Sequence, residues 1–189
     1  MAIPNPNSLF QKLHAEAKSA GIIPNTLASH KWFLSKLSGM RQNIAERTII
    51  TDPTLKSGNR AKIGKMYAFR YDPKHKLTLP LYDMFPLILM VGPARGANGE
   101  QGFYGLNLHY LPPQARAVFF DRLMSFTNKR YDANTQIRLS YSMLKSAARL
   151  KAFAPCFHMY LLKHMKGFAV EIPATEWEIA LFMPCENFK

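Results

Sequence analysis

Apolar and polar positions alternate with two different periods along this chain, and its middle third has the period of β-strands. Met66–Tyr71 is rich in aromatic residues, Leu87–Val91 is a continuous apolar run that ends at Gly92, and Phe103–Tyr110 alternates. Aromatic residues fit a pleated, half-buried sheet, and a short apolar run bounded by turn residues fits a buried strand. We therefore expect three sequential antiparallel strands with tight connections.

The segment before these strands has the longer period of amphipathic helices. Ser8 precedes an apolar stripe with four-residue spacing, and Gly21 follows it. Because serine favours helix N-caps and glycine favours the residue after a helix, a short helix is predicted between them, to about Ala20. A second helix is predicted over residues 26–46, and a polar, turn-rich linker over residues 48–62.

The segment after the three strands returns to helical spacing and ends in two more apolar runs. A Pro-Pro pair precedes a helix predicted over residues 114–127, and a second amphipathic helix is predicted from about residue 133 to 153. A short segment over Cys156–Lys166 follows. Phe168–Pro173 and Trp177–Met183 are predicted as the fourth and fifth strands, because both runs are short and apolar.

Helices before a group of strands and between its third and fourth members indicate an α+β fold. We expect a small, strongly bent antiparallel barrel of the SH3-like or OB-like kind, with N-terminal helices and a helical insertion between strands three and four. The expected organisation is an N-terminal arm and short helix over residues 1–25 and a single α+β domain over residues 26–189. Within that domain we expect a β core at residues 63–111 and 168–184 and a helical insertion at residues 112–166.

Net charge is the strongest global feature. The 189 residues include 25 Lys and Arg against 12 Asp and Glu, a formal net charge of +13. Residues 1–80 hold 13 basic and four acidic residues, whereas residues 171–189 hold one basic and four acidic residues. Such an excess favours a polyanion such as nucleic acid, or an anionic membrane surface. Solubility, or contact with an acidic protein, would explain the same excess.

The cysteine content and the hydropathy indicate synthesis in a reducing compartment. The two cysteines, Cys156 and Cys185, are too few for a disulfide framework, and the first ten residues do not resemble a signal peptide. The longest apolar runs are far shorter than the roughly 20 residues that span a bilayer. No membrane insertion is expected.

Side chains that support catalysis or metal binding are present, but their spacing matches no known site. Cys156, His158, His164 and Cys185 form no paired-ligand motif of a zinc site. Signatures of nucleophilic enzymes and of phosphate-binding glycine loops are absent as well. A metal-dependent nuclease would need clustered carboxylates, but the candidates are scattered: Asp72, Asp83, Glu100 and Asp121. We expect no enzymatic activity, no cofactor and no metal.

Candidate phosphate contacts lie in one predicted helix and around the first predicted strand. Arg138, Lys145 and Arg149 are separated by seven and four residues, so they share one face of the helix predicted over residues 133–153. Further candidates lie in the linker and near the first strand: Lys56, Arg60, Lys62, Arg70, Lys74 and Lys76. Rows of cations are also common on solvated faces, so this alternative stays open.

Aromatic residues alternate with these cations. Tyr67, Phe69 and Tyr71 share the first predicted strand with Arg70, and Tyr104 and its neighbours lie in the third. Aromatic side chains beside cations hold single strands or frayed ends in small β-barrels. Alternate aromatic residues in a short strand also fill a core, and the sequence does not separate the two interpretations.

Four segments of the chain carry a resemblance to a known group of proteins. They are G-K-M-Y-A-F-R-Y-D-P-K at Gly64–Lys74, L-P-L-Y-D-M-F-P-L at Leu79–Leu87, G-F-Y-G-L-N-L-H-Y-L-P-P at Gly102–Pro113, and E-W-E-I-A-L-F-M-P-C-E-N-F at Glu176–Phe188. Together they resemble small virion proteins of T-even-like contractile-tailed bacteriophages, in particular the DNA end protector proteins. The similarity covers roughly residues 26–188.

The resemblance implies a virion protein that binds the ends of packaged linear double-stranded DNA without sequence preference and shields them from host exonuclease. Such a protein would be made in the bacterial cytoplasm and delivered to it again with the genome, and its partners would be DNA and other virion proteins. The resemblance supplies no binding residues, so the candidate contacts above rest on charge. The alternative is a structural protein of the phage neck, tail or baseplate that acts through protein–protein contacts.

The cation row on the predicted helix gives a first testable prediction. Replacing Arg138, Lys145 and Arg149 together by alanine should weaken DNA binding and lower its dependence on salt, because fewer counterions are released. The measurement is affinity at several salt concentrations, with circular dichroism to verify folding. Unchanged affinity in a folded triple variant would remove these residues from the candidate interface.

Overall fold

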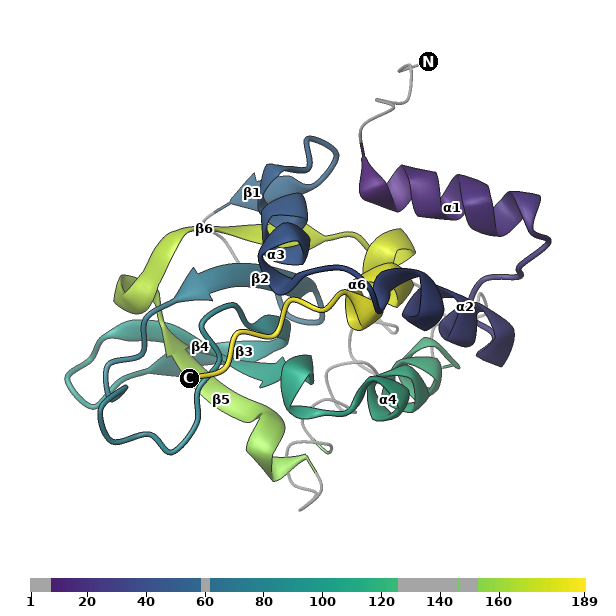
Figure 1. The fold of residues 1–189 in the computed structure, drawn as a ribbon. Helices are drawn as coiled ribbons and strands as arrows, with labels where there is room; N and C mark the ends of the chain where they lie inside the picture. Colours follow the sequence, from purple (N-terminus) through teal and green to yellow (C-terminus); the bar gives the residue numbers. More distant parts are fainter. Residues whose placement is uncertain (1–7, 59–61, 126–145, 147–152) are drawn as a thin grey trace.

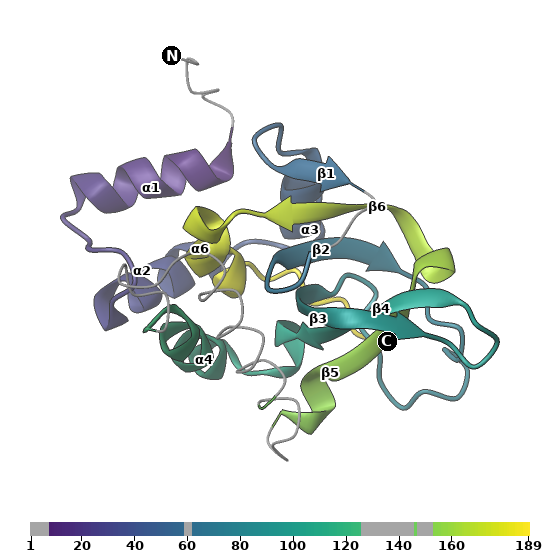
Figure 2. The same ribbon diagram turned by 180° about the vertical axis from the view of Figure 1, so that it is seen from behind.

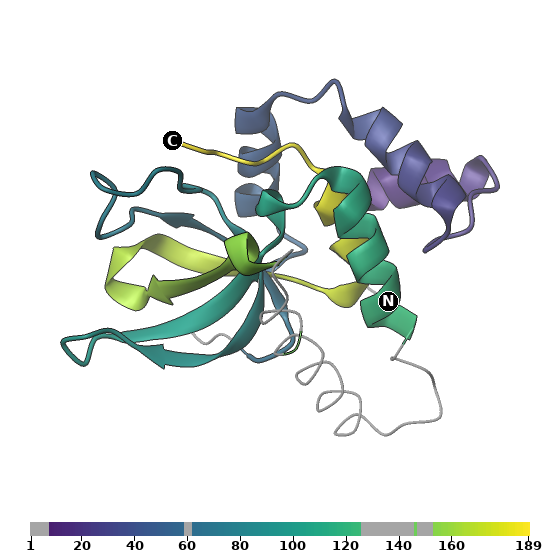
Figure 3. The same ribbon diagram turned by 90° about the horizontal axis from the view of Figure 1, so that it is seen from below.

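The computed structural model describes residues 8–58, 62–125, 146 and 153–189. Within them the chain forms an antiparallel sheet with helices packed mainly on one of its faces, which confirms the α+β class. Helices α1, α2, α4 and α6 gather on one side of the molecule and the sheet fills the other (Figures 1 and 3). Among the described helices, none is long and apolar enough to cross a membrane.

The sheet has six strands in the order β1-β6-β2-β3-β4-β5, and each neighbouring pair is antiparallel. The strands are β1 Lys56–Gly58, β2 Met66–Tyr71, β3 Leu87–Arg95, β4 Gln101–Asn107, β5 Phe157–Leu161 and β6 Met165–Ile172. The three sequential strands expected in the middle of the chain are therefore confirmed as β2, β3 and β4. Seen from behind, β6 lies between β1 and β2 at the upper edge of the sheet (Figure 2).

The sheet is strongly bent but is not a closed barrel. β5 at one edge continues through the short 3₁₀-helix η3 (Leu162–His164) directly into β6, near the other edge. The Leu161 amide donates to the Tyr71 hydroxyl at 3.0 Å, and the Asp72 amide donates to the His164 carbonyl at 3.0 Å. These contacts tie the turn to the end of β2, while β1 and β5 remain the two edges of an open sheet. The expected SH3-like or OB-like barrel is not confirmed.

Alternation along β2 builds two separate apolar clusters, one on each face of the sheet. Met66 and Ala68 face the main core with the helices, whereas Tyr67, Phe69 and Tyr71 face the concave side. There Phe69 packs edge-to-face against rings from three other positions: Tyr71, Phe103 and Tyr160. The aromatic strand residues therefore mainly fill a second core.

The N-terminal part forms three helices: α1 Leu9–Ser19, α2 Leu27–Leu37 and α3 Gln42–Thr51. The prediction of one helix over residues 26–46 is wrong, because the chain leaves helical geometry after Leu37 and starts a new helix at Gln42. Gly39 lies in the break, and glycine costs about 1 kcal/mol within a helix. Thr26 and Ser29 begin α2 with a reciprocal capping box.

Among the described residues, two further α-helices belong to this layer: α4 Pro113–Ser125 and α6 Trp177–Phe182. The prediction of a fifth strand over Trp177–Met183 is wrong, and so is this part of the expected β core at residues 168–184. Every residue of α6 is buried, so its sequence has no polar face and its period cannot distinguish helix from strand. The Trp177 indole donates to the Ile172 carbonyl at 2.7 Å and turns the chain from β6 into this helix.

Other boundaries also differ from the sequence predictions. The expected linker at residues 48–62 holds the end of α3 and the strand β1, and the expected helical insertion at residues 112–166 contains β5. β3 continues through Gly92 and Pro93 because the register shifts there, which accommodates a proline in a strand. The helix predicted over residues 133–153 lies almost wholly outside the described residues. The remaining short helices are η1 Leu108–Tyr110, η2 Ala154–Cys156 and η4 Ala174–Glu176.

The concave aromatic cluster predicts a large stability effect at Phe69. Phe69→Ala should lower the free energy of unfolding by about 3–5 kcal/mol, because the side chain is 1% exposed and its removal leaves a cavity. Phe168→Ala is the matched control on β6, since this phenylalanine is 48% exposed, and it should cost about 0.5 kcal/mol. Urea denaturation measures both, and equal costs would contradict a role for the cluster.

Candidate nucleic-acid interface

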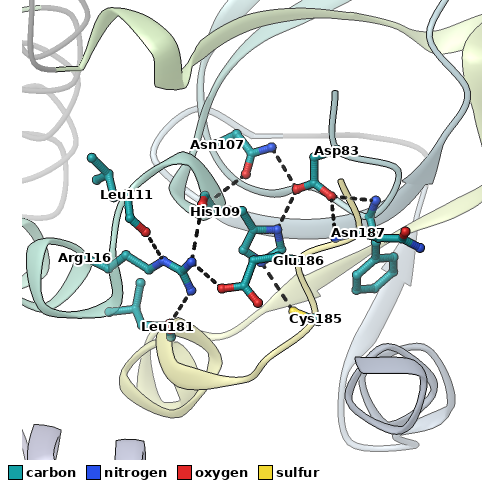
Figure 4. Close-up of polar contacts among 10 residues, drawn as sticks. Asp83, Asn107, His109, Leu111, Arg116, Leu181, Cys185, Glu186 and Asn187 are labelled. Atoms are coloured by element: carbon teal, nitrogen blue, oxygen red, sulfur yellow. Dashed lines mark hydrogen bonds and ion pairs between the residues drawn. The ribbon is translucent and has the colours of Figure 1, made fainter. Parts of the chain in front are cut away.

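A buried carboxylate joins three segments of the chain (Figure 4). Asp83 is 4% exposed, and both of its oxygens are occupied. Oδ2 lies 2.6 Å from Nδ1 of His109 and accepts from the Asn107 amide at 3.0 Å. Oδ1 accepts from the backbone amides of Phe85 and Asn187 at 3.0 and 3.1 Å. Asp83 therefore joins the loop before β3, the end of β4 and the C-terminal tail.

Arg116 of α4 extends this network to the other side of His109 (Figure 4). Its guanidinium donates to the Leu111 carbonyl at 2.8 Å, to the Leu181 carbonyl at 3.0 Å and to the His109 carbonyl at 3.4 Å. It also pairs with Glu186 of the tail. The buried charge is thus satisfied in several directions, as a buried cation requires. The network fixes the tail against the loop at residues 82–85, where Tyr82 and Lys189 exchange backbone hydrogen bonds.

Cys185, His109 and Asp83 have the connectivity of a nucleophile, a base and an orienting carboxylate. The Cys185 sulfur lies 3.4 Å from Nε2 of His109. The thiolate is the reactive form of cysteine, however, and burial raises the pKa of this thiol well above its ordinary value. The sulfur is also fully buried, with no approach for a substrate. In this conformation the three residues stabilise the tail and present no nucleophile.

Exposed cations gather at one end of the sheet, where β2 ends and η3 leads into β6. We call this surface the basic end, and it consists of Arg70, Lys74, Lys76, Lys163 and Lys166. Arg70 and Lys166 are direct cross-strand partners, which puts two like charges side by side. The turn and the neighbouring loops lie at the left of the molecule in Figure 1. Pairing of β2 with β6 therefore brings together cations separated by about a hundred residues in sequence.

Three carboxylates lie among these five cations. Asp72 pairs with Lys76 at 2.9 Å and with Lys166 at 3.7 Å, and Glu100 pairs with Lys163 and, at 3.4 Å, with Lys74. Arg70 pairs with Glu46 at 2.6 Å.

The lysine contacts lower the pKa of both shared carboxyl groups. For Asp72 the main cause is the hydrogen bond from Lys76, and for Glu100 the one from Lys163. The lysine members of these pairs are exposed, and ion pairs with a solvated member contribute little to stability.

The structure groups some of the candidate phosphate contacts and separates others. Arg70, Lys74 and Lys76 belong to the basic end. Lys56 lies on the edge strand β1 and is exposed, and Lys62 precedes β2, where its backbone amide donates to the Tyr67 hydroxyl at 2.9 Å. The remaining candidates lie outside the described residues: Arg60, Arg138, Lys145 and Arg149.

Sequence reasoning missed Lys163 and Lys166. Both fall in the segment over Cys156–Lys166, which was expected to be part of the helical insertion. Their proximity to Arg70 depends on the β2–β6 pairing, a contact between distant parts of the chain. A prediction that β6 begins at residue 165 and pairs with β2 would have identified these two lysines as neighbours of Arg70.

A pocket of about 300 Å³ opens beside the basic end. Its lining includes Lys74, the tyrosines Tyr71, Tyr110 and Tyr160, and exposed leucines of the loop after β2. Aromatic and aliphatic walls with a few polar groups are typical of ligand pockets, and this volume lies at the lower end of their range. Across the described part of the chain, no group of three or more His, Cys, Asp or Glu residues has the arrangement of a metal site.

The fold and this surface define a basic α+β protein with a cation-rich end beside an aromatic pocket. A family model described as the phage T4 terminal DNA protecting protein matches residues 3–189. The chain belongs to this family, which confirms the resemblance to the DNA end protector proteins. No curated protein and no solved structure matches it.

The buried network predicts a strong, pH-dependent effect at Asp83. Asp83→Asn should lower the free energy of unfolding by about 3 kcal/mol, because it removes a buried charge from four donors. Burial alone would raise the pKa of Asp83, but hydrogen bonds and charge from His109, with Asn107 and the Phe85 amide, bring it below its ordinary value. The carboxylate therefore stabilises the fold above the unfolded pKa of about 3.9, and this contribution is lost as pH falls through the lower folded pKa.

Denaturation from pH 7 down to about pH 2 measures this contribution. The variant should show a shallower loss of stability in the acid range than the unmodified protein. Asp121→Asn, at a half-exposed carboxylate on α4, is the control for the loss of one negative charge and should lower the free energy of unfolding far less than Asp83→Asn does. An Asp83 variant with wild-type stability would contradict the role assigned to the network.

Proposed function

We propose that this protein is a non-enzymatic virion protein that binds the ends of linear double-stranded DNA and protects them from host exonuclease. Membership of the terminal DNA protecting protein family supports the role at DNA ends. The observation that carries the proposal is the basic end, where five exposed cations converge from β2, the loop after it and the turn into β6.

Electrostatics supports binding without sequence preference. Phosphate contacts position a protein on DNA but read no bases, and each one releases counterions. Two lysines share Glu100 and two share Asp72, so both groups keep a net positive charge for phosphates. The affinity of the basic end for DNA should therefore fall steeply as salt increases.

The absence of catalysis is part of the proposal and rests on the geometry of the candidate groups. Cys185 is buried, and the Asp83 carboxylate is fully occupied by donors. Protection by this protein would then result from occupation of the DNA end, which denies an exonuclease its starting point. Chemistry on the DNA would not be needed.

A second function, docking to other virion proteins of the neck, tail or baseplate, is supported by a different surface. Ile23 and Leu27, at the connection between α1 and α2, are 69% and 70% exposed. A groove at the same place is lined by Ile22, Ile23 and Phe33. Exposed apolar side chains beside an apolar groove are typical of protein contact sites. This surface lies on the side of the molecule opposite the basic end (Figure 1).

Charge removal at the basic end tests the DNA-binding role. Lys76→Gln, Lys163→Gln and Lys166→Gln together leave Lys74 with Glu100 and leave Asp72 partly solvated, so the fold should persist. We expect weaker binding to linear DNA, a salt slope smaller by about two to three, and loss of protection against a processive exonuclease. Lys12→Gln, Lys18→Gln and Lys31→Gln on α1 and α2 remove the same charge from exposed helix positions and are the control.

The outcomes separate the two functions. Loss of binding and protection only in the basic-end variant supports the proposal. Equal losses in both variants would mean that net charge alone binds DNA. Absence of binding by the unmodified protein near physiological salt would favour the structural role in the virion.

A further inference from the structure

The pocket beside the basic end combines flat, apolar walls with an adjacent cation. Tyr110 and His158 lie against each other on one side, with ring centroids 4.6 Å apart and planes inclined by 36°. Burial is the main cause that lowers the pKa of His158, so its imidazole is uncharged near neutral pH. Tyr71 and Tyr160 belong to the second core and are 7% and 4% exposed, and they meet edge-to-face at 5.0 Å behind the same lining. These walls suit a flat aromatic ligand.

The mouth of the pocket is also apolar and exposed. Leu79, Leu81 and Met159 line it and are 40–48% exposed. Leu77, in the same loop and directly after Lys76, is 94% exposed. Exposed apolar side chains grouped around a concave site indicate a surface that is covered by a partner.

The charges around the pocket favour a ligand with an anionic part. Lys74 lines the pocket, and Lys163 shares Glu100 with it, so one carboxylate faces two ammonium groups. Asp83 and Glu100 also line the pocket. The four hydrogen bonds of Asp83 compensate its charge, and the two lysines paired with Glu100 outweigh its single negative charge. The site therefore offers stacking walls for an aromatic ring and a neighbouring positive field for a phosphate. A nucleotide combines an aromatic base with a nearby phosphate and therefore matches both features.

We propose that this pocket binds the base of an unpaired terminal nucleotide of the DNA. The phosphate of that nucleotide would be held by Lys74 and the other cations of the basic end. The inference rests on the proposed function and explains how an end would be distinguished from the interior of a duplex. Extracting a base from a duplex requires unstacking and unpairing, and this cost is lowest where the base is already single-stranded. Only a frayed or overhanging end supplies such a nucleotide on linear double-stranded DNA, so circular duplexes would be bound by phosphate contacts alone.

Filling the pocket tests the inference without removing a cation. Ala97→Trp at the exposed β3–β4 turn and Met159→Trp on β5 each place an indole in the lining, and neither residue belongs to the Asp83 network. Val118→Trp on the exposed face of α4 is the matched control, since its side chain is 55% exposed and lines none of the four described pockets.

Two measurements are made on the full chain. The first is the ratio of affinities for linear and circular DNA of one sequence. The second is the fluorescence of 2-aminopurine placed at the terminal position of either strand, or at an internal position, of a short duplex. We expect a preference for linear DNA and a fluorescence change only at a terminal position. Each filled variant should lose the signal and about tenfold of the preference, the scale of one stacked base.

Each outcome bears on one of the two proposals. Filled variants that keep the end preference and the terminal signal would overturn the pocket assignment while leaving DNA end protection intact. An unmodified protein that binds linear and circular DNA equally and gives no exonuclease protection would overturn the proposed function itself. Loss of preference in Ala97→Trp and Met159→Trp, with retained non-specific affinity and an unaffected Val118→Trp, would support the inference.

Discussion

The buried carboxylate of Asp83 is the contact on which the arrangement of this molecule depends. Its four donors come from His109, Asn107, Phe85 and Asn187, so one side chain joins segments separated by up to 104 residues. A buried charge is costly unless it is hydrogen-bonded on all sides, and partial satisfaction would be worse than an apolar core. The tail therefore has one low-energy position, against the loop that borders the pocket. The hydrogen bonds of Asp83 therefore fix both the position of the buried tail and the position of the loop that lines the pocket.

The bend of the sheet produces the basic end in a similarly indirect way. Because only η3 separates β5 from β6, the chain must turn sharply at Leu162–His164, and the amide of Leu161 and the hydroxyl of Tyr71 secure the turn. The lysines on this turn then lie beside Arg70 and the loop after β2. Repulsion between neighbouring cations is reduced by Asp72 and Glu100, which each contact two lysines. The carboxylates stabilise a cation cluster that remains positive overall.

The sequence predicted what depends on local pattern and missed what depends on distant partners. β2 follows from its aromatic alternation, and α1 from its apolar stripe and Gly21, so both were predicted. Ser8 is the N-cap residue, but its hydroxyl donates to Asp52 at 2.7 Å and makes no cap hydrogen bond. The prediction of a strand over Trp177–Met183 failed because α6 is buried on all sides and has no polar face. Its isoleucine and aromatic residues suit a strand equally well. Arg70, Lys74 and Lys76 were identified as candidate contacts because they lie in or directly after a predicted strand. Lys163 and Lys166 were missed because only the β2–β6 pairing brings them there.

The placement of the charged and apolar surfaces removes an apparent conflict between the two candidate functions. The basic end is built by strand ends and turns of the sheet, whereas Ile23 and Leu27 lie at the connection between two helices on the other side (Figure 1). A DNA end bound at the first surface does not cover the second. The cations would also repel an approaching basic protein surface, whereas the apolar connection carries no such restriction. If both proposals hold, a single copy would hold a DNA terminus and still dock in a particle, so evidence for docking would not count against DNA end protection.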